Sequence, residues 1–155
     1  MVEDDLIKKT LETSKTIAMV GVSSIKKEVR TDVKRRPSTI VMKYMQEFGY
    51  KVIPVNPFSV GEKIHGEIIV SKLSDIKIPI DIVDVFRPSK EATMIAEDVI
   101  KIGAKVFWLQ YGIQNDEAKK IVESKNISYI ANKCIKQEYQ RLFLKTNPVF
   151  PALKK

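Results

Sequence analysis

The stretch TIAMVGVSS at residues 16–24 decides the fold, because an unbroken apolar run leads directly into a glycine turn. Apolar continuity without alternation is typical of a parallel strand that is covered on both faces. Gly21, at the end of the run, permits a tight turn in which backbone N–H groups can approach an anion. The stretch therefore predicts a buried strand of an α/β sheet, with a candidate anion-binding turn at its carboxyl end.

Apolar strands and amphipathic helices alternate through the rest of the chain. Further strands are expected at 50–57, 80–86, 104–112 and 127–131. Helices are expected at 3–13, from Ser38 to about 48, and at 89–102, 115–124 and 134–144. This order predicts βαβ units in a doubly wound parallel sheet of about five strands with helices on both faces, a Rossmann-like α/β architecture.

Length and composition set the class of protein. A chain of 155 residues with no linker-like stretch predicts one domain over residues 1–155. It begins MVEDDLIKK, with acids where a signal peptide carries positive charge, and its apolar runs are only strand-sized. The single cysteine, Cys134, cannot form an internal disulfide and is most easily kept reduced inside the cell. We therefore expect a cytoplasmic protein without a membrane segment.

The charge balance favours an anionic partner. The chain carries 27 lysines and arginines against 19 acidic residues, a formal net charge of +8. Nucleic acid, a membrane surface and a phosphate-bearing metabolite all fit such an excess, as does a lysine-rich surface that only faces solvent. The net charge alone leaves these alternatives open.

The predicted architecture says where a ligand would bind. In a doubly wound sheet, ligands lie outside the carboxyl ends of the strands, where the strand order reverses. Five segments are expected at that edge, namely 21–38, 54–60, 86–90, 110–115 and 131–136.

The first of these segments lacks the G-x-G-x-x-G fingerprint of dinucleotide-binding domains, because its opening glycine is followed by no other before the next helix. This counts against a standard NAD or FAD site. The turn continues through Val22, Ser23 and Ser24 into a basic loop that includes Arg36. Ser38 is expected to be the N-cap of the next helix, whose N-terminus attracts phosphate. The alternative is that Ser38 only caps the helix and the basic side chains only face solvent.

The second segment has an amide where NAD-binding domains usually have an acid for the ribose hydroxyls. Asn56 occupies this place, between Pro54 and Pro57. An amide tolerates a nearby phosphate better than a carboxylate does. A rigid turn made of prolines is the alternative interpretation.

The third expected strand ends in Phe86, Arg87 and Pro88 at the same edge. The ring and the guanidinium can stack on an adenine or pair with a phosphate, whereas a core phenylalanine and a surface arginine are the alternative. The next strand ends in three more candidates, Gln110, Tyr111 and Gly112.

No catalytic or metal-binding set is predicted. Asp81 and Asp84 stand three residues apart on a strand, which places them on opposite faces and makes them poor partners for acid–base chemistry. His65, the only histidine, is expected to be an ordinary surface residue. One histidine and one cysteine are too few for a zinc site. Trp108 is expected in the core.

The motifs IAMVGVSS, GYKVIPVNP, DVFRP and WLQYGI, followed by NKCIKQEYQRL, together resemble the small stand-alone CoA-binding proteins. The domain of that family is similar to the N-terminal half of the succinyl-CoA synthetase alpha subunit. The resemblance covers about residues 14–143, nearly the whole chain. It implies a binding site for coenzyme A (CoA) or an acyl-CoA.

The resemblance also implies which segment meets which part of the ligand. The phosphates would face the turn at Gly21, Val22 and Ser23 and the helix start at Ser38. The adenosine would lie near Pro54, Asn56 and Pro57. The pantetheine would run along Phe86, Arg87 and Pro88 and then Gln110, Tyr111 and Gly112. The loop between Gly21 and Ser38 is several residues longer than is typical of the family, which leaves open which of its basic residues meet phosphate.

Cys134 matches a cysteine in the closing motif of the family, near the expected end of the pantetheine arm. It is either a small packing residue or a thiol able to form a mixed disulfide with CoA. The phosphohistidine of the synthetase lies in a second domain that this sequence lacks. The resemblance therefore implies a binding module without catalytic activity of its own, which senses, carries or presents the cofactor, in the last case to a partner protein.

Two alternatives remain at this stage. An NAD(P)-binding protein, either dehydrogenase-like or redox-sensing, is conceivable because related domains bind NAD; the missing glycines and Asn56 argue against it. A basic nucleic-acid-binding protein is supported only by the net charge, since no stacking platform or recognition helix is evident.

Overall fold

The computed structural model describes residues 3–22 and 37–144, and these form one five-stranded sheet with helices on both faces. The strands are β1 (Thr16–Val20), β2 (Lys51–Val55), β5 (Ile82–Val85), β6 (Val106–Leu109) and β7 (Ser128–Ile130). Their spatial order is β2-β1-β5-β6-β7, and every neighbouring pair is parallel. The predicted doubly wound, Rossmann-like α/β fold is therefore confirmed.

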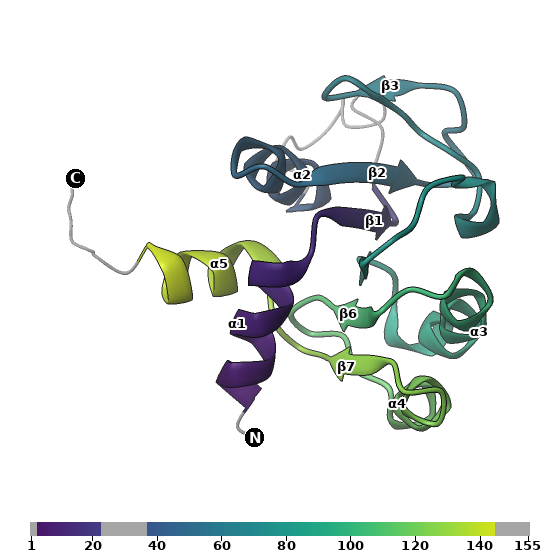
Figure 1. Cartoon of the computed structure of the whole chain (residues 1–155). Coiled ribbons are helices and arrows are strands. Elements are labelled where there is room, and N and C mark those ends of the chain that lie inside the picture. The colour runs from purple at the N-terminus through teal and green to yellow at the C-terminus, as the bar shows by residue number, and fades with distance from the viewer. Residues whose placement is uncertain (1–2, 23–36, 145–155) are drawn as a thin grey trace.

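The helices divide between the two faces of the sheet (Figure 1). One face is covered by α1 (Glu3–Thr13), α2 (Pro37–Glu47) and α5 (Ile135–Phe143), the other by α3 (Ala92–Ile102) and α4 (Asp116–Glu123). The predicted helices thus exist, each within a few residues of the expected bounds. Within residues 3–22 and 37–144, no helix is both long and apolar enough to cross a membrane.

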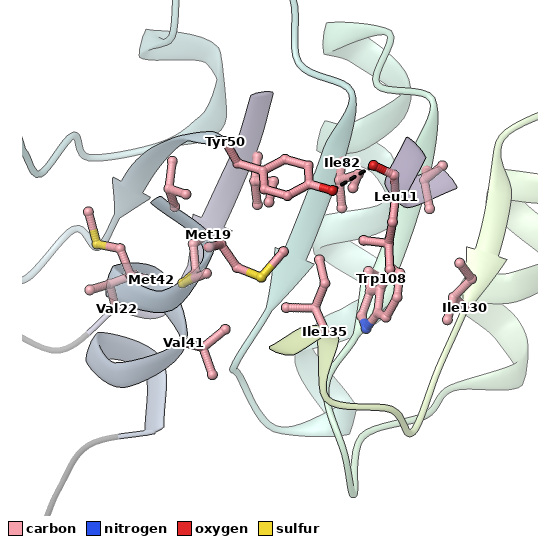
Figure 2. Packing of buried hydrophobic residues seen from close by; sticks show 14 of the residues in the cluster. Leu11, Met19, Val22, Val41, Met42, Tyr50, Ile82, Trp108, Ile130 and Ile135 are labelled. Atoms are coloured by element: carbon pink, nitrogen blue, oxygen red, sulfur yellow. Dashed lines mark hydrogen bonds between the residues drawn. The ribbon is translucent and has the colours of Figure 1, made fainter. Parts of the chain in front are cut away.

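The core beneath α1, α2 and α5 contains the larger side chains. Figure 2 shows Trp108 and Met19 packed in this layer with Ile135 and Val41. Trp108 is fully buried, as predicted for a core residue, and its indole N–H donates a 2.8 Å hydrogen bond to the carbonyl of Lys133. Burial of an indole is favourable when its one donor is satisfied in this way.

Local capping signals correctly predicted one end of α3 and one end of α4. Asn115 is the N-cap of α4, as predicted, and its side chain accepts a hydrogen bond from the N–H of Ala118 at 2.9 Å. Gly103 closes α3 in the left-handed region, with a φ of 73°. The prediction for Ser38 is wrong. The helix α2 begins at Pro37, so Ser38 lies inside its first turn and is buried; proline favours the first helical position because it has no N–H to leave unsatisfied.

A small hairpin between β2 and β5 was not predicted from the sequence. It consists of β3 (Lys63–Ile64) and β4 (Glu67–Ile68), joined by His65 and Gly66 with φ values of 50° and 84°. Two successive residues of positive φ are typical of a type I′ turn. Strands of two residues are too short to show the alternation of apolar and polar residues by which a strand is recognised in a sequence. The chain then runs beside β2 through a parallel bridge between Val55 and Val70.

A carboxylic acid lies at the centre of the sheet. Asp84 of β5 is paired in register with Met19 and Trp108, so its side chain lies on the face covered by α1, α2 and α5. It is fully buried, and neither carboxyl oxygen has a hydrogen-bond partner in the described part of the chain. Burial raises the pKa of Asp84 well above its ordinary value, because the charged form is poorly solvated there.

Asp81, three residues earlier, has the opposite environment. Its carboxylate accepts hydrogen bonds from the backbone N–H groups of Lys15 and Thr16 at 2.7 and 3.2 Å. Burial alone would raise the pKa of Asp81, but these N–H groups, together with the ammonium of Lys105 at 3.5 Å, hold it below its ordinary value. The two acids are therefore separate in position and in charge state, and they do not form an acid–base pair.

We predict opposite effects of neutralising these two acids. The pKa of Asp84 is raised in the folded state, so stability falls as the pH rises from the unfolded pKa, about 4, towards the folded one. Asp84→Asn should remove this slope and increase the free energy of unfolding near neutral pH by roughly 1–3 kcal/mol. The matched variant Asp81→Asn should instead lose stability, since the depressed pKa of Asp81 stabilises the fold above about pH 4. Urea unfolding over a pH series measures both; a less stable Asp84→Asn at neutral pH would contradict the assignment.

Candidate functional site

The strand order reverses between β1 and β5, which places the expected ligand position at the carboxyl ends of these two strands. The chain goes from β1 to β2 on one side and then crosses to β5 on the other. Crevices of doubly wound sheets lie at such switch points. Two clefts open at this edge, one on each side of the sheet.

The first cleft, of about 240 Å³, lies on the side of α3. It combines apolar walls with charged and polar groups, and its lining residues include Gly21, Asn56, Pro57, Phe58, Lys72, Leu73, Arg87, Glu91, Ile95 and Asp98. The guanidinium of Arg87 holds the carboxylate of Glu91 by two hydrogen bonds, Nε to Oε1 at 2.9 Å and Nη2 to Oε2 at 2.8 Å. These hydrogen bonds raise the pKa of Arg87 and lower that of Glu91.

Position 21 needs a glycine because the residues after β5 lie close to it. Its φ is 97°, a region that residues with a Cβ rarely adopt. A Cβ at this position would lie 2.9 Å from Cδ of Arg87 and 3.2 Å from the carbonyl oxygen of Phe86. The N–H of Gly21 is already used, because it donates to the carbonyl of Val55 at 2.9 Å. The absence of a side chain at Gly21 therefore allows the ends of β1 and β5 to lie close together. The N–H of Gly21 is not available to an anion.

Asn56 ties two of the edge loops to each other. Its Nδ2 donates to the carbonyl of Val22 at 2.8 Å, and its Oδ1 accepts from the N–H of Phe58 at 2.8 Å. An aspartate could make the second bond but not the first, because it has no donor when ionised. The hydrogen bond to Val22 thus gives a structural reason for an amide at this position.

The second cleft, of about 600 Å³, lies on the side of α2 and α5. It is lined by Pro37, Val41, Phe86, Gln110, Tyr111, Ile113, Cys134 and Gln137. Gln110 is only 5% exposed, and its Oε1 accepts a 3.1 Å hydrogen bond from the N–H of Ile135. This bond and the one from Trp108 to Lys133 attach the start of α5 to the end of β6. The half-buried thiol of Cys134 is therefore held at the cleft by a fixed segment.

The predicted site residues divide among these places. Gly21, Asn56, Pro57 and Arg87 line the first cleft, and Phe86, Gln110, Tyr111 and Cys134 line the second. Five others, Val22, Ser38, Pro54, Pro88 and Gly112, lie at or near the edge but line neither. Pro54 is a buried residue within β2. The remaining three, Ser23, Ser24 and Arg36, lie outside the described residues.

Several lining residues were not predicted. Phe58, 78% exposed, follows Asn56 and Pro57 in an expected segment, so an aromatic residue at the ligand edge was an available signal. Lys72 had no such signal, because it reaches the edge through the bridge between Val55 and Val70. Glu91 and Asp98 come from the segment around α3, where helical periodicity says nothing about a ligand.

Chemically, the edge can hold an elongated ligand with anionic and apolar parts. The first cleft supplies Arg87 and Lys72 as cations, and the second supplies apolar walls, an amide and a thiol. Among the described residues, no group of three or more His, Cys, Asp or Glu side chains could hold a metal ion.

Comparison with known proteins decides the family. A family model described as a CoA binding domain matches residues 15–140. The chain belongs to this CoA-binding domain family. The match confirms the family that the motifs resembled, and it covers the sheet together with the edge that carries both clefts.

Relatives share both sequence and fold with this CoA-binding domain. The protein YneT of Bacillus subtilis is 43% identical over 130 residues, which cover 84% of this chain and 89% of that protein. The structure of cell-free ID.343 from Thermus thermophilus has 35% identity and a TM-score of 0.81, covering 92% of this chain and all of that one. The dinucleotide-forming acetyl-coenzyme A synthetase 1 of Ca. Korarchaeum cryptofilum, at 21% identity and a TM-score of 0.63, shares the fold over 80% of this chain and 27% of its own.

We predict that Gly21→Ala destabilises the CoA-binding domain by roughly 2–3 kcal/mol, because both backbone strain and the contact with Arg87 oppose a Cβ there. Gly61→Ala is the matched control. Gly61 has a similar φ of 89°, but a Cβ would meet nothing within 4 Å, so only strain of about 1 kcal/mol is expected. Urea unfolding compares the two variants, and equal losses would contradict a close approach at Gly21.

Proposed function

We propose that the domain binds CoA or an acyl-CoA across the carboxyl edge of its sheet, with the nucleotide in the first cleft and the pantetheine arm in the second. The observation that supports this most is the position of the two clefts. They flank the end of β5, in a chain of the CoA-binding domain family, so a ligand with a nucleotide at one end and a long arm at the other can occupy both.

The first cleft suits the nucleotide. Phe58 is largely exposed beside Pro57, where an adenine ring can stack on it. Arg87 and Lys72 line the same cleft and provide donors for phosphate. The proposal also includes phosphate contacts from the turn at Gly21, Val22 and Ser23 and from the start of α2. The N–H of Gly21 itself is excluded, because it donates to the carbonyl of Val55.

The second cleft suits the pantetheine arm. Val41, Phe86 and Ile113 provide apolar surface, and Gln110 provides an amide for the polar groups of the arm. Tyr111 is 75% exposed at the rim, where it can cover a bound arm. The thiol or thioester end of the ligand would then lie near Cys134.

The proposed role is binding without catalysis. A cytoplasmic module of this kind would sense, carry or present the cofactor, and the exposed rim of Phe58 and Tyr111 would be accessible to a partner protein. An NAD-type ligand fits less well. The position that usually carries the ribose-binding acid is Asn56, whose amide is occupied by Val22 and Phe58.

We predict that CoA stabilises the protein against heat and that NAD does not. At a hundred times its dissociation constant, a ligand that binds only the folded state adds roughly 2.7 kcal/mol. A thermal-shift series with CoA, acetyl-CoA, NAD and NADP measures this. A rise with NAD and none with CoA or acetyl-CoA would overturn the proposal.

We further predict that Cys134 exchanges with CoA disulfide. Its thiolate would attack one sulfur of the disulfide, forming a Cys134–CoA mixed disulfide and releasing one CoA thiolate. Intact-mass spectrometry should detect one CoA adduct that dithiothreitol removes, and the control Cys134→Ser should bind CoA but show no adduct. An unmodified Cys134 in protein that binds CoA would leave the residue a packing role only.

A further inference from the structure

The guanidinium of Arg87 already has an anionic partner within the first cleft. Arg87 is the second residue after β5, and Glu91 lies four residues later at the end of the short 3₁₀ turn Ser89–Glu91. Two hydrogen bonds join the side chains, and both side chains line the cleft. The carboxylate of Glu91 therefore occupies two of the donors that a phosphate in this cleft would use.

This ion pair is accessible enough to exchange its anion. The side chains of Arg87 and Glu91 are 43% and 35% exposed, and ion pairs of such exposure contribute little to stability. A monoester phosphate presents the same bidentate geometry to a guanidinium as a carboxylate does, with up to twice the charge. Lys72 lines the same cleft and has no acidic partner among the described residues, so a phosphate there would meet two cations.

We infer that Glu91 holds Arg87 in place of a ligand phosphate, and that binding exchanges this carboxylate for the monoester 3′-phosphate of CoA. The inference rests on the proposed function and adds a residue that sets its affinity and specificity. The exchange predicts the opposite effect on CoA affinity from an ion pair in which Glu91 only positions Arg87. If Glu91 only orients Arg87 for the ligand, its removal weakens binding; if Glu91 competes with the phosphate, its removal strengthens binding.

The test measures the dissociation constant of CoA by isothermal titration calorimetry for the unsubstituted protein and for Glu91→Gln. The exchange predicts about a two- to fivefold lower constant for Glu91→Gln, the range that one exposed ion pair sets. Glu97→Gln is the matched control, because Glu97 is an exposed acid of α3 that lines neither cleft. It makes the same change in net charge and should leave the constant unchanged.

Two further arms make the result specific to Arg87 and to the 3′-phosphate. In an Arg87→Ala background, Glu91→Gln should give no gain, and with dephospho-CoA the gain should also be absent. Unchanged or weaker CoA binding by Glu91→Gln, an equal gain in Glu97→Gln or in the Arg87→Ala background, or an equal gain with dephospho-CoA would overturn the inference. Failure of the unsubstituted protein to bind CoA would overturn the proposed function as well, so the two failures are distinguishable.

Discussion

The position of β1 between β2 and β5 determines where the other parts of the edge lie. Because β1 pairs with β2 on one side and with β5 on the other, the turn after it is confined between two strand ends. Gly21 meets this constraint by donating to Val55 on one side and by leaving room for Phe86 and Arg87 on the other. The turn that was predicted to bind an anion therefore also packs the ends of β1, β2 and β5 against one another. The N–H of Gly21 is used in this packing and is unavailable to a ligand.

The residues after β5 contribute to both clefts, which lie on opposite faces of the sheet. Side chains alternate between the two faces along an extended chain, and just beyond β5 Phe86 lines the second cleft while Arg87 lines the first. The face of α1, α2 and α5 carries the larger core side chains, and it also carries the cleft with Cys134. A ligand that spans both clefts, as proposed for CoA, must cross the end of β5.

Local signals in the sequence predicted most of the fold but fewer than half of the residues that line the two clefts. Apolar strands and the caps at Asn115 and Gly103 depend on neighbours within a few residues, so they can be recognised without tertiary information. The role of Asn56 depends on a carbonyl 34 residues earlier, and Lys72 reaches the edge through a strand bridge. Such contacts arise only from the assembled sheet. The same is true of Asp84, because nothing in the strand sequence indicates that its carboxyl has no hydrogen-bond partner among the residues that the structure describes.

The chain has a formal net charge of +8, but the described lining of the first cleft is not similarly basic. Among residues 3–22 and 37–144, two cations, Arg87 and Lys72, line this cleft together with two acids, Glu91 and Asp98. The overall field attracts anions of every kind and speeds their approach, but a charge-balanced cleft does not select among them by charge alone. Under the exchange inferred for Glu91, selection would depend on which anion forms a better bidentate contact with Arg87 than Glu91 does. A phosphate monoester carries close to two charges where a diester carries one, so the inferred exchange would favour CoA over NAD.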